Sequence, residues 1–276
     1  MPELPEVEHV VRALRGSISG NTIITAELRL RRIAHDSSPA VFNRKLRDAR
    51  IEDISRRGKQ IVIHLDNNRV LLVHLRMTGK FVSLKPEQPL PPHAHVIFYL
   101  NDDRRLVYCD MRQFGRMRVA AASRLAQSRE LRPLAPEPLS DDFSQDYLLS
   151  VLSRSRRTLK QLLLDQTKIV GLGNIYASEA LFLASVHPLT IAGSLSSKRG
   201  ARLHEAIRTV LKEAIAAGST LRIDLADANE SYFGAEERFW RVYERDGEPC
   251  VNCGRLIRRV VHAGRSTYFC SRCQRR

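Results

Sequence analysis

The stretch CVNCGRLIRRVVHAGRSTYFCSRC, residues 250–273, contains two CxxC pairs with 16 residues between them. Four thiolates at this spacing suit the tetrahedral ligation of one zinc ion. The residues between the pairs alternate between apolar and basic types around Ala263 and Gly264, which predicts a β-hairpin with one ligand pair at each base. The sequence therefore predicts one structural Zn²⁺, and its expected ligands are Cys250, Cys253, Cys270 and Cys273.

Two disulfides are the alternative for these four cysteines, and they would need an oxidising compartment. The first eight residues, MPELPEVE, do not favour that compartment. Three acids precede any Lys or Arg there, whereas a secretory signal begins with basic residues and continues with an apolar run. The fifth cysteine, Cys109, lies in the β-like stretch LVYCD and is expected to be a small buried residue.

The hydrophobic pattern changes along the chain. Residues 22–119 carry short β-like runs, namely TIITAELRL, IVIHL, RVLLVHL, HVIFYL and RLVYCDM, and many short strands favour a sandwich or barrel. Residues 143–217 have helical periodicity in YLLSVLSR, LKQLLLDQ, NIYASEALFLA and RLHEAIRTVLKEAIAA. Between these regions, RPLAPEPLSDD (residues 132–142) holds three prolines and is typical of a linker.

The N-terminal residues predict a helix that begins near Pro5 and ends at Gly16, because apolar side chains recur on one face between them. Acids in the first turn would complement the helix dipole. This helix gives no reason for a second proline, Pro2, with Glu3 beside it.

The overall charge favours a polyanionic partner. Lys and Arg total 45 against 30 Asp and Glu, which leaves a net charge of +15. Each phosphate that such a protein neutralises releases counterions, although ribosomal and membrane-surface proteins share this composition. No apolar run reaches the roughly 18 to 20 residues that span a bilayer, so a cytosolic protein is the default. A chain of 276 residues suits two or three compact units.

Three turns could each bind a phosphate group. Gly171 and Gly173 precede a helix expected to begin near Asn174, and a glycine-rich turn before a helix offers N–H groups to an anion. The other two are RRGK, residues 56–59, and the hairpin turn with Arg265. A glycine pair alone is more often only a tight turn. Three such points on separate elements favour contacts with a phosphate backbone.

The segment DMRQFGRM places Arg112 two residues before Phe114 after a strand. An aromatic side chain beside an arginine at a loop tip can enter a base stack while the guanidinium occupies the vacated pairing position. Met77 in HLRMTGK is a second apolar candidate for the same gap. Taken separately, Phe114 and Met77 are better explained as core side chains.

Together these motifs resemble those of the formamidopyrimidine-DNA glycosylase family. PELPEVE, RRGK, HLRMTGK, DMRQFG, VGLGNIYASE and the terminal CxxC-x16-CxxC occur in the order of that family, over nearly the whole chain. The resemblance implies a multidomain α+β protein. Its parts would be an N-terminal β-sandwich domain with a flanking helix (1–131), a linker (132–142), a helix-two-turn-helix domain with a lesion-recognition loop (143–240) and a zinc-finger hairpin (241–276).

The resemblance also implies a bifunctional DNA glycosylase and AP lyase of base excision repair. Such an enzyme excises 8-oxoguanine and formamidopyrimidines from damaged double-stranded DNA. Removal of Met1 would expose the amine of Pro2, which would form a Schiff base with the sugar before β,δ-elimination cuts the strand. A terminal α-amine titrates near about 8, so a neutral fraction exists at physiological pH. Glu3 would transfer protons during these steps.

The remaining functional residues are carried over from the family by the same motifs. Lys59 would join Pro2 and Glu3 in the catalytic group and, with Asn174 and Arg265, would contact phosphates around the flipped nucleotide. Lys160 matches a family lysine near the site, although a solvated helix face explains it about as well. The residues expected to bind DNA are Met77, Arg112, Phe114, Lys160, Asn174 and Arg265.

One loop departs from the family pattern. Members that excise 8-oxoguanine commonly carry a loop resembling DGKPGYF, whereas this chain has DANESYFGAEERFW without the glycine-proline pair. Ser231, Tyr232 and Phe233 are expected to form the lesion loop. Gln113 stands where many members have a basic residue, so both the base preference and the reading of the opposite base stay open.

Two other functions remain as alternatives. One is an endonuclease VIII-like glycosylase for oxidised pyrimidines, and the other is a non-catalytic protein that binds damaged DNA. The LPE sequence after Pro2 and the Arg112/Phe114 pair favour oxidised purines, while the presence of both Pro2 and Glu3 favours catalysis. The resemblance implies a monomer in the bacterial cytoplasm, associated with the nucleoid and with no membrane partner.

Overall fold

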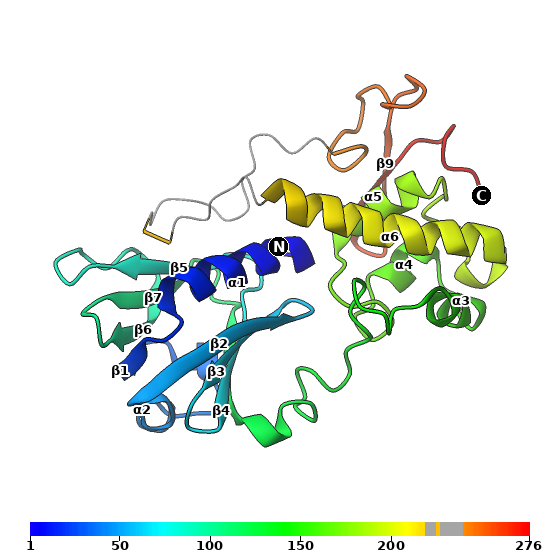
Figure 1. Ribbon diagram of the computed structural model, residues 1–276. Coiled ribbons are helices and arrows are strands. Elements are labelled where there is room, and N and C mark those ends of the chain that lie inside the picture. Colours follow the sequence, from blue (N-terminus) through cyan, green and yellow to red (C-terminus); the bar gives the residue numbers. More distant parts are fainter. Residues whose placement is uncertain (219–224, 227–239) are drawn as a thin grey trace. The chain divides into compact units, whose positions relative to one another are not determined.

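The computed structural model describes residues 1–218, 225–226 and 240–276. The predicted lesion-loop residues Ser231, Tyr232 and Phe233 lie outside the described residues. The chain forms two compact units, one built on Met1–Arg132 and the other on Pro133–Ala217 together with residues 240–276 (Figure 1). The first is mainly β and the second is helical with a β-hairpin, so the predicted α+β class is confirmed. None of the described helices combines the length and apolar character that a membrane crossing needs.

The described part of the first unit contains an eight-stranded sheet in the order β5-β7-β6-β1-β2-β3-β4-β8. β1 and β2 pair over Thr22–Arg50 and Ile23–Ala49, so two four-stranded halves meet at a short seam. Both halves contribute side chains to one hydrophobic core, as expected for a sandwich. The strands are β1 Thr22–Leu28, β2 Ala49–Arg57, β3 Gln60–Leu65, β4 Arg69–His74, β5 Gly79–Leu84, β6 Ala94–Leu100, β7 Arg105–Asp110 and β8 Arg116–Ala121.

The helix α1, Leu4–Ile18, packs against β2 and β3 (Figure 1). It continues two residues beyond Gly16, where the sequence pattern predicted its end. Ile18 is fully buried, and burying such a side chain contributes about 1.5–3 kcal/mol. This gain exceeds the roughly 1 kcal/mol that a glycine costs inside a helix, so the helix extends to Ile18.

Some elements of the first unit were not among the predicted runs. β2, β5 and β8 are strands, and α2, Pro39–Leu46, is a short helix. In ARIEDISRR of β2, three positions are buried, and they are interrupted by charged residues that hide the alternation. α2 begins after Ser38, whose hydroxyl accepts the N–H of Val41 at 3.3 Å. A helix of eight residues is too short for a clear periodic signal.

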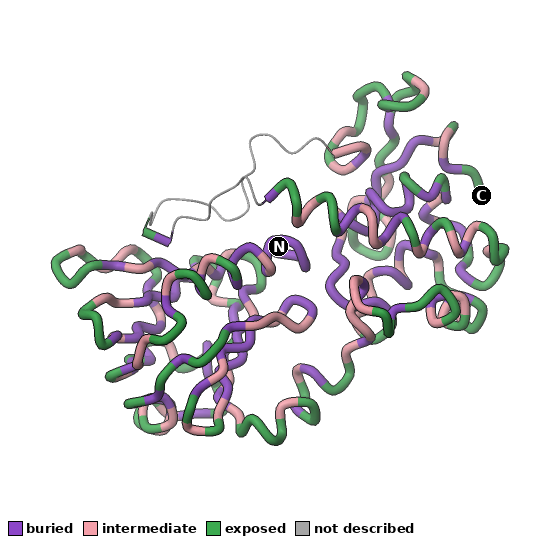
Figure 2. Tube along the Cα trace, in the orientation of Figure 1, coloured by how far each residue is buried: buried purple, intermediate pink, exposed green. Residues whose placement is uncertain are grey.

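The predicted amphipathic stretches of the second unit are helices, namely α3 Gln145–Ser153, α4 Leu159–Leu163, α5 Asn174–Leu183 and α6 Ser197–Gly218. α5 begins at Asn174, as expected, and is buried along most of its length (Figure 2). The zinc hairpin consists of β9, Arg258–His262, and β10, Arg265–Phe269. Ala263 and Gly264 form its turn with φ of 48° and 73°, so the predicted hairpin and its turn are confirmed.

Glu179 on α5 fixes the chain that leads into the zinc hairpin. Its side chain is buried, and its two oxygens accept the N–H groups of Arg241, Val242 and Tyr243 at 2.9, 2.9 and 3.0 Å. Phe182, one turn further along α5, packs with Tyr268 in the small core under the hairpin. The hairpin is therefore attached to α5 by polar and apolar contacts.

Candidate functional site

The four cysteines of the second unit meet at the base of the zinc hairpin. All their Sγ atoms lie within 4.8 Å of one another. Cys250 and Cys273 are 3.9 Å apart and Cys253 and Cys270 are 3.6 Å apart, between sulfur atoms. Tetrahedral zinc with bonds of about 2.3 Å requires sulfur separations of about 3.8 Å, whereas a disulfide requires about 2.05 Å. The donor set therefore fits one structural zinc ion and not two disulfides.

Removing the zinc is expected to unfold the hairpin, because a segment of this size buries too little apolar surface to fold without its metal. We expect chelation, or Cys253→Ser, to expose residues 250–273 to limited proteolysis while the helical circular dichroism signal is retained. The matched control is Cys109→Ala. Cys109 is buried in β7 of the first unit and is not one of the four zinc ligands, and burial raises the pKa of its thiol to about 11. A metal-free protein whose hairpin resists the protease would contradict this prediction.

The N-terminus of the first unit places an acid next to Pro2. Pro2 is buried, and Glu3 is 2% exposed. The backbone N–H of Glu3 donates to Oε2 of Glu6 at 2.9 Å, in the first turn of α1. Glu6 thus holds the backbone of Glu3 in place, which is a structural role at the start of α1.

Lys59 lies in the tight turn between β2 and β3, where Gly58 has a φ of 58°. Arg56 of the same RRGK motif does not serve as an open phosphate ligand. Its Nε donates to Glu8 on α1 at 3.0 Å and its Nη1 donates to the carbonyl oxygen of Gly58 at 3.0 Å. Burial favours the neutral acid of Glu8, but hydrogen bonds and charges from Arg56 and Arg12 lower its pKa. The ion pair between Arg56 and Glu8 attaches the turn that contains Lys59 to α1, the helix that follows Glu3.

His74, at the end of β4, is a neighbour of Lys59 that the sequence analysis did not select. Its Nδ1 accepts the N–H of Arg76 at 3.0 Å. Burial, together with the charges of Arg76 and Lys59, lowers the pKa of His74 to about 3. The ring is therefore neutral near pH 7, and because Nδ1 accepts a hydrogen bond, its proton is on Nε2. Of these two cations only Arg76 lies in the same motif as His74, HLRMTGK, so the local sequence held only part of this signal.

Met77 and Phe114 are not core side chains. They are 39% and 41% exposed, in the loops that follow β4 and β7. The guanidinium carbon of Arg112 lies 4.9 Å from the centre of the Phe114 ring. The two loops are in contact, because the N–H of Arg112 donates to the hydroxyl of Thr78 at 3.0 Å. The structure thus brings the three residues of the predicted wedge onto one exposed edge of the first unit.

Lys160 is 1% exposed, so a solvated helix face does not explain it. Its ammonium donates to the carbonyl oxygen of Asn174 at 2.9 Å and to the hydroxyl of Ser178 at 2.6 Å. The side chain of Asn174 in turn donates to the carbonyl oxygen of Ser266 at 3.0 Å. Lys160 therefore supports the first turn of α5, and Asn174 joins that turn to β10 beside Arg265.

The side chain of Gln166 supports the glycine turn before α5. Gln166 donates to the carbonyl oxygen of Leu172 and accepts the N–H of Gly171, both at 2.9 Å. Gly171 has a φ of 86°, a conformation that favours glycine. On the surface nearby, Lys160 and Arg265 both line a hollow of about 280 Å³. Lys160, Asn174 and Arg265 are thus grouped in the second unit.

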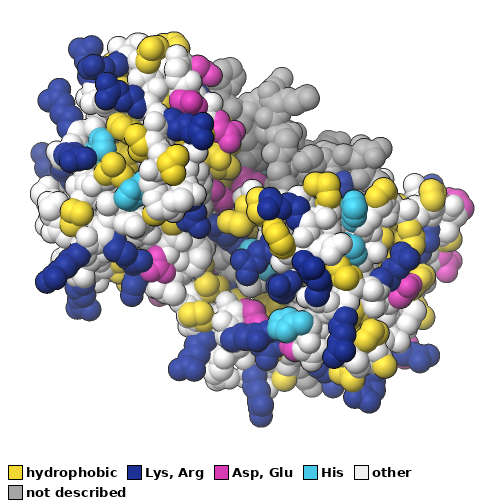
Figure 3. Space-filling model, turned by 180° about the vertical axis from the view of Figure 1, so that it is seen from behind, with side chains coloured by type: hydrophobic (Ala, Val, Ile, Leu, Met, Phe, Trp, Pro, Cys, Tyr) yellow, Lys and Arg dark blue, Asp and Glu magenta, His cyan; other side chains and the backbone are white. Residues whose placement is uncertain are grey.

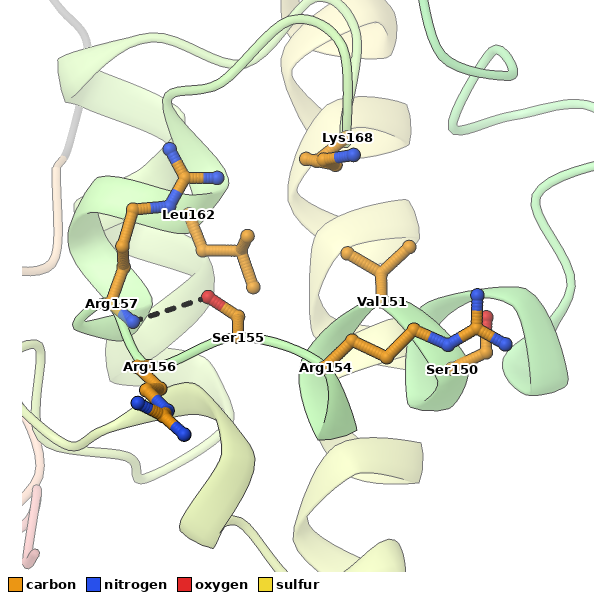
Figure 4. A pocket seen from close by; sticks show the side chains of 8 residues that line it. All are labelled: Ser150, Val151, Arg154, Ser155, Arg156, Arg157, Leu162 and Lys168. Atoms are coloured by element: carbon orange, nitrogen blue, oxygen red, sulfur yellow. Dashed lines mark hydrogen bonds between the residues drawn. The ribbon is translucent and has the colours of Figure 1, made fainter.

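A second hollow of the helical unit, about 310 Å³, lies between α3 and α4 and is rich in cations. Figure 4 shows that its arginines diverge: the guanidinium groups of Arg154, Arg156 and Arg157 point in different directions. Arg157 is paired with Asp165 at 2.8 Å. This hollow is not a converged anion site. Lys and Arg side chains predominate over acidic ones on the face of each unit that Figure 3 shows.

Three matches to family models cover most of the chain. Residues 1–117 match the formamidopyrimidine-DNA glycosylase N-terminal domain, residues 134–224 match the H2TH domain of the same glycosylase, and residues 247–276 match a zinc finger found in FPG and IleRS. The order of these domains agrees with the order of the motifs in the sequence.

Full-length relatives and solved structures agree with these matches. The formamidopyrimidine-DNA glycosylase of Heliobacterium modesticaldum is 45% identical over 100% of both chains. Lactococcus lactis Fpg in complex with FAPY-dG-containing DNA has a TM-score of 0.90 and 33% identity over 99% of this chain and 100% of that chain. The same values of TM-score and identity hold for Lactococcus lactis Fpg with DNA containing an oxidised pyrimidine, over 100% of both chains.

Proposed function

Because this chain belongs to the formamidopyrimidine-DNA glycosylase family, we propose that it excises 8-oxoguanine and formamidopyrimidines from double-stranded DNA and then cleaves the strand by β,δ-elimination. It is a DNA glycosylase for oxidised lesions in base excision repair. The observation that carries the proposed mechanism is the pairing of Pro2 with the buried acid Glu3 at the start of α1.

In the proposed reaction, removal of Met1 leaves Pro2 with a secondary amine. Its lone pair attacks C1′ of the damaged nucleotide, and the bond between C1′ and the base breaks, so the base leaves with the electron pair and takes up a proton. The Pro2 nitrogen loses the proton that it carries after the attack, which frees its lone pair for the next step. Glu3 protonates the ring oxygen of the sugar, which opens to an iminium between Pro2 and deoxyribose. The proline ring limits the rotation of the amine and so favours one direction of attack.

Contacts with phosphate groups would position the DNA for this attack. Lys59 supplies a cation beside the N-terminal helix, and Asn174 and Arg265 supply a second group of donors in the helical unit. Lys160 acts indirectly, because its ammonium holds the backbone of Asn174. Phosphate contacts of this kind bind without regard to sequence and weaken with salt.

The test is borohydride trapping on duplexes with one defined lesion each. We expect a covalent adduct on 8-oxoguanine and formamidopyrimidine duplexes that maps to Pro2 by mass spectrometry, since borohydride reduces the iminium to a stable amine. A duplex without damage is the matched control and should give no adduct. An adduct that maps to a lysine would refute the role of Pro2.

Oxidised pyrimidines are a second substrate class to include in the panel. Lactococcus lactis Fpg has been solved in complex with DNA containing an oxidised pyrimidine. Equal excision rates on oxidised pyrimidines and oxidised purines would widen the proposed lesion range. Excision of oxidised pyrimidines alone would instead favour an endonuclease VIII-like glycosylase.

The protein acts on DNA, and its matched relative comes from a bacterium. We place its activity in the bacterial cytoplasm, in association with the nucleoid, with the protein acting as a monomer on duplex DNA. Fluorescence microscopy of a tagged chain, before and after oxidative damage, tests this placement.

A further inference from the structure

The wedge residues of the first unit lie on two neighbouring crossovers between the halves of the sheet. The segment 75–78 joins β4 to β5, and the segment 111–115 joins β7 to β8. β4 pairs with β8, and β5 pairs with β7, so both segments cross at the same end. The register confirms this proximity, because Gly79 at the start of β5 is opposite Asp110 at the end of β7.

Asp110 is the side chain between these two crossovers. It is fully buried, and both of its carboxyl oxygens accept hydrogen bonds. Oδ2 accepts the N–H of Gly115, after Phe114, at 2.7 Å. Oδ1 accepts the hydroxyl of Thr78, next to Met77. One buried carboxyl group therefore binds the end of one crossover and the other crossover at the same time.

Thr78 connects Asp110 to the backbone of Arg112 through two hydrogen bonds. Its hydroxyl hydrogen is donated to Asp110, and its oxygen accepts the N–H of Arg112 at 3.0 Å. The carbonyl oxygen of Asp110 accepts the N–H of Gln113 at 3.1 Å. Thr78 and Asp110 thus each bind more than one partner, and connected hydrogen bonds of this kind stabilise a polar network.

The backbone near the wedge needs such support. Arg76, before Met77, has a φ of 57°, and Gln113, between Arg112 and Phe114, has a φ of 56°. The left-handed region is unfavourable for residues with a β-carbon, and it persists where surrounding contacts hold it. These two conformations lie next to the three wedge residues, where Thr78 and Asp110 bind the backbone of the segment 111–115.

Packing below the loops adds to this constraint. A β-carbon placed on Gly79 or Gly115 would lie 2.2 or 1.8 Å from the hydroxyl oxygen of Tyr108, which is fully buried. Both crossovers therefore approach Tyr108 closely, at positions that only glycine allows.

From these contacts we propose that Thr78 and Asp110 are positioning residues that preset Met77, Arg112 and Phe114 as one rigid wedge. Asp110 is fully buried, and the hydroxyl of Thr78 is bonded within the loops, so both act through the wedge residues. Their function is to hold two exposed loops together before DNA binds. The loops are then already ordered when the wedge residues insert into the base stack. This inference rests on the proposed function, and it adds the pair that makes the wedge effective against a stacked, paired lesion.

The test compares Thr78→Val, which keeps the shape but loses the hydroxyl, with Thr78→Ser, which keeps the hydroxyl. Single-turnover rates are measured on a duplex with 8-oxoguanine opposite cytosine and on a duplex with an abasic site, where no base must leave the stack. We expect Thr78→Val to slow excision of the paired lesion about 10-fold and to change abasic-site cleavage less than about twofold. Thr78→Ser should match the wild type on both duplexes.

The outcomes separate this inference from the proposed function. A wild-type protein that acts on neither duplex would refute the proposed function. A Thr78→Val variant with wild-type excision of the paired lesion would refute the positioning role alone. An equal loss on both duplexes would also refute it, because that pattern belongs to a general loss of folded protein, which thermal unfolding measures directly. Asp110→Asn provides a second variant, with the same expected difference between the two duplexes.

Discussion

The Pro2→Gly variant is expected to release damaged bases at least about 10²-fold more slowly than the wild type, because the attacking amine loses the ring that orients it and misplacement of a reacting group costs about this much. Glycine retains an N-terminal amine but loses the ring that restricts its direction, and it offers a primary in place of a secondary amine. The measurement is single-turnover base release from an 8-oxoguanine duplex, with borohydride trapping in parallel.

Binding provides the control for this result. Affinity for a duplex with an uncleavable abasic-site analogue should stay within a few-fold of the wild-type value, because the proposed phosphate contacts come from other residues. A preparation that retains Met1, identified by its mass, should show the same loss of activity, since its Pro2 nitrogen is part of an amide. Wild-type rates in the Met1-retaining protein would exclude Pro2 as the nucleophile.

Replacing Glu3 with glutamine is expected to lower base release by about 10²-fold, the usual size of a general acid contribution. Glutamine has nearly the same shape, and the N–H of residue 3 can still donate to Glu6. The loss should therefore appear in the chemical step and not in DNA affinity. Single-turnover kinetics and equilibrium binding on the same duplex measure the two quantities.

Glu52→Gln is the matched control for Glu3→Gln. Glu52 is an exposed residue of β2 in the same unit, so its replacement makes the same change in net charge. Glu52→Gln should leave base release unchanged. If both variants lost activity to the same extent, the effect of Glu3→Gln would be one of charge on DNA binding, and proton transfer would have to be assigned to another group.

Local sequence patterns were sufficient for much of the fold. The two CxxC pairs and the turn at Ala263 and Gly264 predicted the zinc hairpin because ligand spacing and turn chemistry are short-range properties. Helical periodicity identified the stretches of the second unit for the same reason. The pattern failed at β2 and at the end of α1, where burial in the assembled sheet outweighs local propensity.

The sequence could not distinguish the competing roles of single residues. From the sequence, Lys160 could equally be a solvent-exposed helix residue or a lysine near the functional site. The structure buries it against Asn174. Arg56 was grouped with phosphate-binding residues, and the structure pairs it with Glu8. These outcomes depend on contacts across 14 and 48 positions of the chain, which no local pattern specifies.

What the sequence by itself determined is the set of chemical groups: four zinc ligands, a proline next to an acid at the N-terminus, and the motifs that identify the family. These groups can be recognised from the sequence because each depends only on residue type and on short spacing along the chain. The tertiary structure alone decided how Thr78, Asp110 and Arg112 are connected. Thr78 and Asp110 are 32 positions apart in the chain, and the register of β5 against β7 brings them together. Strand register is set by the burial of whole sheet faces in a common core, so it follows from the assembled fold and not from any one segment.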